Sequence, residues 1–83
     1  MIQKLDNNKG QCLCGEVRYI LSGDVNGFYL CHCTRCQQSS GSAHASNAFL
    51  KNANLRFESG EGRINQYKLP GTRFTKRFCS QCG

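Results

Sequence analysis

Gly-Gln-Cys-Leu-Cys-Gly-Glu-Val-Arg-Tyr, at residues 10–19, contains the first two of the seven cysteines. Cys12 and Cys14 stand one residue apart and are followed at once by Gly15. A glycine in that place lets the backbone take a positive φ, so the loop can turn its amides toward both sulfur atoms. Residues 79–83 read Cys-Ser-Gln-Cys-Gly, so the second cysteine of this pair is also followed directly by a glycine. Two such loops supply four thiolates, which is the ligand set of a tetrahedral zinc site.

The shared glycine predicts which cysteines belong together. We expect one closed structural zinc site built from Cys12, Cys14, Cys79 and Cys82. This site joins segments about 70 residues apart and so closes the longest loop that the cysteines can close. Cys36 is followed by Gln37 rather than by glycine and therefore falls into a different set.

The remaining cysteines are Cys31, Cys33 and Cys36, within Cys-His-Cys-Thr-Arg-Cys. Three protein ligands leave one tetrahedral position for water or a substrate, which is the pattern of catalytic zinc. If residues 31–33 are extended, the first two thiols share one face and His32 faces the other. Two alternatives stay open: His44 could complete the ligand shell and make this site structural, and His32 could support the site from outside it.

Length and composition favour metal sites over disulfides. The chain has 83 residues, of which seven are cysteine, none is Trp and 39% are apolar. A hydrophobic core this small needs a metal ion or disulfide bonds to stabilise it. The cysteine count is odd, the spacings are tight, and the N-terminus has no apolar leader segment. We therefore expect a reducing, cytoplasmic location and two zinc ions per chain, with disulfides as the alternative.

Closely spaced turn signals predict an all-β fold of short antiparallel strands pinned by zinc. Residues 1–9 are polar and are expected to fray, which leaves residues 10–83 as one zinc-binding domain. A short helical turn is expected over Thr34 to Ser39. Strands are expected at 17–21, 27–32, 43–50, 55–59, 64–68 and 73–79.

The net charge of +6 favours anionic ligands. Basic side chains gather in one window without an acid, although a solvated basic face would look the same. The sequence holds no recognised nucleic-acid motif, so we do not expect a nucleic-acid partner. No apolar stretch is long enough to predict a membrane span. The basic window comprises Lys68, Arg73, Lys76 and Arg77.

The ordered motifs resemble one known family. The motif at 10–19, Cys-His-Cys-x-x-Cys at 31–36 and Phe-Cys-x-x-Cys-Gly at 78–83 occur in the order of the glutathione-dependent formaldehyde-activating enzymes, a family that includes centromere protein V. Ser40-Gly41-Ser42 and Phe57-x-x-Gly60 also look like the family. The resemblance implies a β-tent fold with the structural zinc named above.

The resemblance also implies a reaction and a substrate site. It implies a second zinc on Cys31, Cys33 and Cys36 with glutathione beside it. The family reaction adds the glutathione thiol to formaldehyde and gives S-(hydroxymethyl)glutathione, a carbon–sulfur lyase chemistry. Glutathione or a similar small thiol is thus the expected partner, and a non-catalytic zinc-stabilised binding module is the alternative. The basic residues expected to meet its two carboxylates are Arg35, Arg73, Lys76 and Arg77.

Family members normally continue for some tens of residues past the final cysteine motif, whereas this sequence stops at Gly83. We therefore expect a domain incomplete at its C-terminal end, with weak activity by itself. The strand at 73–79 would present an open edge, which favours pairing with a second copy as a homodimer.

Overall fold

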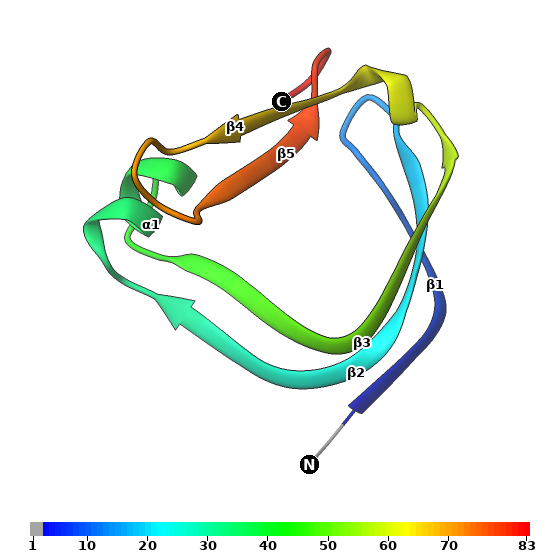
Figure 1. The fold of residues 1–83 in the computed structure, drawn as a ribbon, viewed down its shortest axis with the longest axis horizontal. Coiled ribbons are helices and arrows are strands. Elements are labelled where there is room, and N and C mark those ends of the chain that lie inside the picture. The colour runs from blue at the N-terminus through cyan, green and yellow to red at the C-terminus, as the bar shows by residue number, and fades with distance from the viewer. Residues whose placement is uncertain (1–2) are drawn as a thin grey trace. The chain divides into compact units, whose positions relative to one another are not determined.

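A computed structural model describes residues 3–83, and Met1 and Ile2 of the expected frayed segment lie outside the described residues. The predicted all-β class is confirmed, with 59% of residues in strands and 12% in helices. Figure 1 shows the elements in chain order: β1 (Gln3–Gln11), β2 (Arg18–Cys31), α1 (Thr34–Ser40), β3 (Ala45–Ser59), the 3-10 helix η1 (Glu61–Arg63), β4 (Ile64–Lys68) and β5 (Thr75–Cys79).

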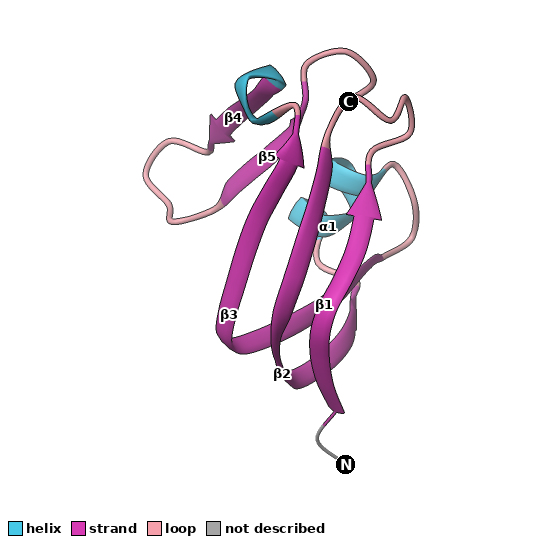
Figure 2. Cartoon of the chain, turned by 90° about the vertical axis from the view of Figure 1, so that its right-hand side faces the viewer, coloured by secondary structure: helices cyan, strands magenta, loops and turns pink. Residues whose placement is uncertain are grey.

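The strands form two sheets. One has the order β1-β2-β3, so strands consecutive in the chain are neighbours (Figure 2). The other is an antiparallel β4–β5 hairpin in which Ile64 pairs with Cys79 and Lys68 with Thr75. Its loop is closed by the amide of Leu69, which donates to the carbonyl oxygen of Phe74 at 3.0 Å. The hairpin thus places Cys79 at the end of β5.

The N-terminal segment differs from the expectation. Residues 3–9 were expected to fray, but they belong to β1 and pair within the three-stranded sheet. Strand β1 contains only one large apolar residue, Leu5, so its sequence lacks the alternation of apolar and polar residues that predicts a strand. Its backbone hydrogen bonds to β2 fix it instead.

Strands β2 and β3 are also longer than expected. The expected strands left breaks at residues 22–26, where Ser22-Gly23-Asp24 is typical of a turn, and at residues 51–54, yet one continuous strand crosses each. The two strands meet closely at Gly23, where a Cβ atom would lie 3.1 Å from the Cα of Ala53. Asn52 donates from Nδ2 to Oδ2 of Asp24 at 3.3 Å. The glycine here permits close strand approach rather than a chain reversal.

The chain comprises two compact units, and the single zinc-binding domain expected at 10–83 stays a prediction. One contains the residues up to Asp6 together with Ser22–Asn54, and the other contains Asn7–Leu21 and Leu55–Gly83. Among the described residues only Val17 and Cys79 are buried apolar side chains, and both keep a small exposed fraction. Within the described part of the chain, no helix has the length and apolar character needed to cross a membrane.

Candidate metal centres

The turn between β1 and β2 presents the first cysteine pair. Cys12 and Val17 close it reciprocally: the amide of Cys12 donates to the Val17 carbonyl oxygen at 3.0 Å, and the amide of Val17 donates to Cys12 Sγ at 3.3 Å. Gly15 has φ of +80° and donates to the Cys12 carbonyl oxygen at 3.1 Å. The positive φ expected from the sequence is therefore present, and Leu13 at the tip is 93% exposed.

The end of β5 presents the second pair in a similar loop. Cys79 is 5% exposed, and its Sγ accepts from the amide of Gln81 at 3.3 Å. Gly83 has φ of +72° and donates to the Cys79 carbonyl oxygen at 2.8 Å. Both loops thus direct backbone N–H groups at sulfur, which favours the thiolate over the thiol.

The four thiols of these loops meet in one cluster, which we call the closed cluster: Cys12, Cys14, Cys79 and Cys82. All four sulfur atoms lie within 4.8 Å of one another. The Sγ of Cys14 lies 3.6 Å from that of Cys12 and 3.8 Å from that of Cys79. Zinc at about 2.3 Å from four tetrahedral sulfur atoms would space them about 3.8 Å apart. The geometry therefore fits a zinc-sized ion.

Segments outside the loops brace the closed cluster. Gly60, with φ of +77°, packs so closely on the backbone of Glu16 that no Cβ atom would fit. Ser59 donates from Oγ to the Glu16 carbonyl oxygen at 3.3 Å. The amide of Ser80 donates to the carbonyl oxygen of Arg63 at 2.8 Å. Both cysteine loops are thus anchored to the segment between β3 and β4.

The thiols of the closed cluster differ in proton affinity. The N–H of Val17 lowers the pKa of Cys12 to about 6, aided by hydrogen bonds from the neighbouring thiols. The N–H of Glu16 acts in the same direction on Cys14, but desolvation and the other three thiols raise its pKa to about 12. One thiolate that accepts from its neighbours is the expected state of a packed thiol set without a metal.

The other cysteines form a second cluster around the start of α1, which we call the open cluster: Cys31, Cys33 and Cys36. Cys31 ends β2, Cys33 caps the helix and Cys36 lies in its first turn. The Sγ atoms of Cys31 and Cys33 are 3.5 Å apart, and all three lie within 4.8 Å of one another. These distances also fit one zinc-sized ion.

Backbone amides tune this cluster too. The amide of Cys36 donates to Cys33 Sγ at 3.4 Å and lowers the pKa of Cys33 to about 7. The hydrogen bond with Cys31, together with desolvation, raises the pKa of Cys36 to about 12. The helix cap therefore makes Cys33 a more readily ionised thiol than Cys36.

No fourth ligand joins the open cluster among residues 3–83. His32 and His44 pack on each other instead, with ring centroids 5.3 Å apart and planes tilted by 47°. Ser42 holds the backbone of His44 by donating from Oγ to its carbonyl oxygen at 2.6 Å, and Ser40 donates to the same oxygen at 3.0 Å. Among the described residues, the open cluster therefore contains three thiols and no fourth His, Cys, Asp or Glu atom.

Comparison with known proteins gives one family match, which spans both cysteine clusters. Residues 7–83 match the family model of the glutathione-dependent formaldehyde-activating enzyme, so the match covers both clusters. The chain belongs to this family. Comparisons with curated proteins and with solved structures yield no significant match. Glutathione-dependent formaldehyde activation is accordingly the function that membership indicates at family level.

The basic residues expected to meet glutathione lie in different parts of the chain. Arg35 is exposed on α1, between two ligands of the open cluster. Arg73, Lys76 and Arg77 belong to the other unit, in or next to β5. Arg77 donates from Nε to Oε1 of Gln66 at 2.9 Å, across the hairpin. Of the four, only Arg35 shares a unit with the open cluster.

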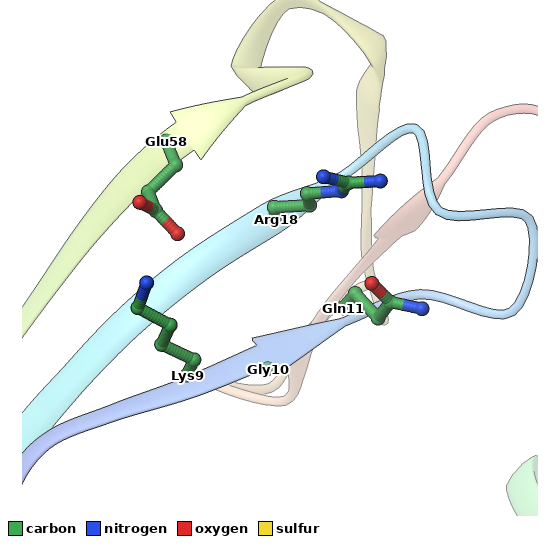
Figure 3. Close-up of a pocket in the computed structure, with 5 residues that line it drawn as sticks. All are labelled: Lys9, Gly10, Gln11, Arg18 and Glu58. Carbon is green, nitrogen blue, oxygen red and sulfur yellow. The ribbon is translucent and has the colours of Figure 1, made fainter.

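Two pockets of this family member were not foreseen from its sequence. Figure 3 shows a polar pocket of about 440 Å³, with Lys9, Gly10 and Gln11 of β1, Arg18 of β2 and Glu58 of β3. Its mixed charges and lack of a thiol give it no part in the cysteine chemistry. A second, apolar cavity of about 420 Å³ lies against the closed cluster. Its lining includes Val17, Leu21, Phe57, Ile64 and Phe78.

Proposed function

We propose that this chain is a zinc-dependent carbon–sulfur lyase of the S-(hydroxymethyl)glutathione synthase type. The observation that carries the proposal is the open cluster, in which three thiols gather around one point and no described residue supplies a fourth ligand. Family membership supplies the substrates, glutathione and formaldehyde. A closed four-ligand shell would have favoured a purely structural role.

Cys31, Cys33 and Cys36 would hold the catalytic zinc. The bound ion would supply an open position at which a thiol is held as thiolate, the nucleophilic form. In the reaction the sulfur forms a bond to the formaldehyde carbon, and the carbon–oxygen double bond becomes single. The proton lost by the thiol is balanced by one gained at that oxygen, which gives the hydroxymethyl group. The cysteines position the ion and take no covalent part.

The closed cluster would hold a second, structural zinc. Its ligands come from two loops 65 residues apart at Cys14 and Cys79, so the ion would close most of the chain. Both roles need reduced thiols, which is why we also propose a reducing compartment such as the cytoplasm.

Basic side chains would bind the carboxylates of glutathione. Arg35 is the first candidate because it lies within the open cluster's own motif. Arg73, Lys76 and Arg77 remain candidates from the second unit. A positive side chain near a zinc bound by three thiolates would also offset the negative charge of that ion and its ligands.

The test is the rate at which the zinc-loaded chain converts glutathione and formaldehyde to S-(hydroxymethyl)glutathione, followed by exchange NMR above the spontaneous rate. We expect Cys33→Ser to abolish the added rate, whereas Thr34→Ala, an exposed neighbour without a thiol, retains it. Glutathione binding without an added rate in the loaded wild-type chain would overturn the lyase assignment and favour a zinc-stabilised binding module.

A further inference from the structure

An exposed aromatic pair stands near the open cluster. Tyr29 of β2 and Phe49 of β3 pack edge to face, with ring centroids 5.4 Å apart and planes at 63°. Tyr29 is 58% exposed and Phe49 is 51% exposed. Rings this exposed bury little apolar area, so their contribution to the stability of the fold does not explain why they lie there.

The strand geometry places this pair on the side of Cys31. Strand β2 runs unbroken from Arg18 to Cys31, and side chains alternate between the faces of a strand. Tyr29 and Cys31 therefore share one face, about 6.8 Å apart along the strand. Phe49 contacts Tyr29 and so extends the same face onto β3. Phe28 and Leu30 belong to the opposite face.

The orientation of the Tyr29 ring is set by its neighbours. It lies over Gly27, where a Cβ atom would stand 2.6 Å from the ring. Any side chain at residue 27 would push the ring away, so the glycine and Phe49 together set its orientation. The two rings thus form an ordered apolar surface on the same face of the sheet as Cys31.

We infer that the Tyr29–Phe49 pair contacts the substituent of a thiol held at the open cluster, and that this cluster accepts, besides glutathione, thiols with an apolar or aromatic substituent. This inference rests on the proposed function, since it takes the substrate sulfur to lie at the open cluster. A three-carbon arm that ends in a ring is about as long as the separation of Tyr29 and Cys31 along the strand. Aromatic contacts of this kind strengthen binding about tenfold.

The experiment uses the full chain loaded with Co²⁺, whose thiolate absorption reports a new sulfur ligand without turnover. The probes are 3-phenylpropane-1-thiol and 3-mercaptopropan-1-ol, which share the three-carbon arm and differ at its end. We expect the phenyl thiol to bind about tenfold more tightly. Tyr29→Ala and Phe49→Ala should remove most of that preference. Phe28→Ala and Leu30→Ala, on the opposite face and similarly exposed, should keep it.

Glutathione serves as the third probe and separates this inference from the proposed function. If all three thiols bind with equal affinity, or if Phe28→Ala lowers the preference as much as Tyr29→Ala, the inference is wrong and the function stands. If no thiol changes the cobalt spectrum, both fail. Cobalt content and circular dichroism of each variant show whether a loss of preference comes from a loss of folding.

Discussion

The closed and open clusters use the same thiol chemistry but differ in how the chain builds them. The closed cluster joins loops distant in sequence and includes Cys79, which is 5% exposed. The open cluster lies within residues 31–36, and Cys33 is exposed. An ion in the first cluster restricts most of the unfolded chain, whereas an ion in the second restricts one short loop. From this contrast we propose that the closed cluster serves stability and the open cluster serves the reaction.

Cys79→Ser should have the largest effect. It removes the buried thiol of the closed cluster, where zinc binding would contribute on the order of 10 kcal/mol to folding. We expect the variant to lose cooperative thermal unfolding as followed by circular dichroism. Wild-type melting with full zinc content would show that the closed cluster does not hold the fold.

Cys33→Ser should have a local effect. The ligands of the open cluster are close in sequence, so their loss leaves the long-range closure intact. We expect zinc content to fall from two ions to one while the melting temperature changes by a few degrees, on the order expected for about 1 kcal/mol. Unfolding as complete as that of Cys79→Ser would contradict the division of roles.

Gly60→Ala tests the brace beneath the closed cluster. The added Cβ atom would meet the Glu16 backbone at a positive φ, so we expect a loss of about 1–3 kcal/mol in the free energy of unfolding. Gly62→Ala is the matched control, because an added Cβ atom there meets nothing within 4 Å. Equal denaturation midpoints for the two variants would show that the contact of Gly60 with the Glu16 backbone does not stabilise the protein.

Acidification should weaken zinc binding at the open cluster. The pKa of Cys33 is lowered from 9.0 to about 7, so its thiolate is present above that pH and is lost as the pH falls through it. Binding must also displace a proton from Cys36, whose pKa is about 12. We expect the affinity to fall roughly tenfold per pH unit for each proton displaced, as measured by chelator competition. An affinity independent of pH would contradict this ligand set.

The sequence predicted local features well and long-range ones only in part. Glycines after Cys14 and Cys82 predicted positive φ, and the structure has it at Gly15 and Gly83. The same cysteines that the sequence grouped lie together, although their role as ligands stays a prediction. These features depend on a few residues and their immediate neighbours, which is why spacing suffices to find them.

Other features needed three-dimensional information. Strand β1 is polar, so only its pairing reveals it. Gly23 looked like a turn, but it serves a close strand contact with Ala53. The Tyr29–Phe49 contact joins two strands whose register no local pattern specifies. The homodimer expected through the β5 edge stays a prediction.

X-ray absorption of the zinc-loaded wild-type chain, combined with its zinc content, is the sharpest test of the two-site assignment, because the absorption spectrum gives the average number of sulfur neighbours per ion. We expect two zinc ions per chain and an average of three to four sulfur neighbours per ion. A small contribution from an oxygen or nitrogen atom at the open cluster should complete the spectrum. Two ions each bound by four sulfur atoms, or a single ion per chain, would contradict this assignment.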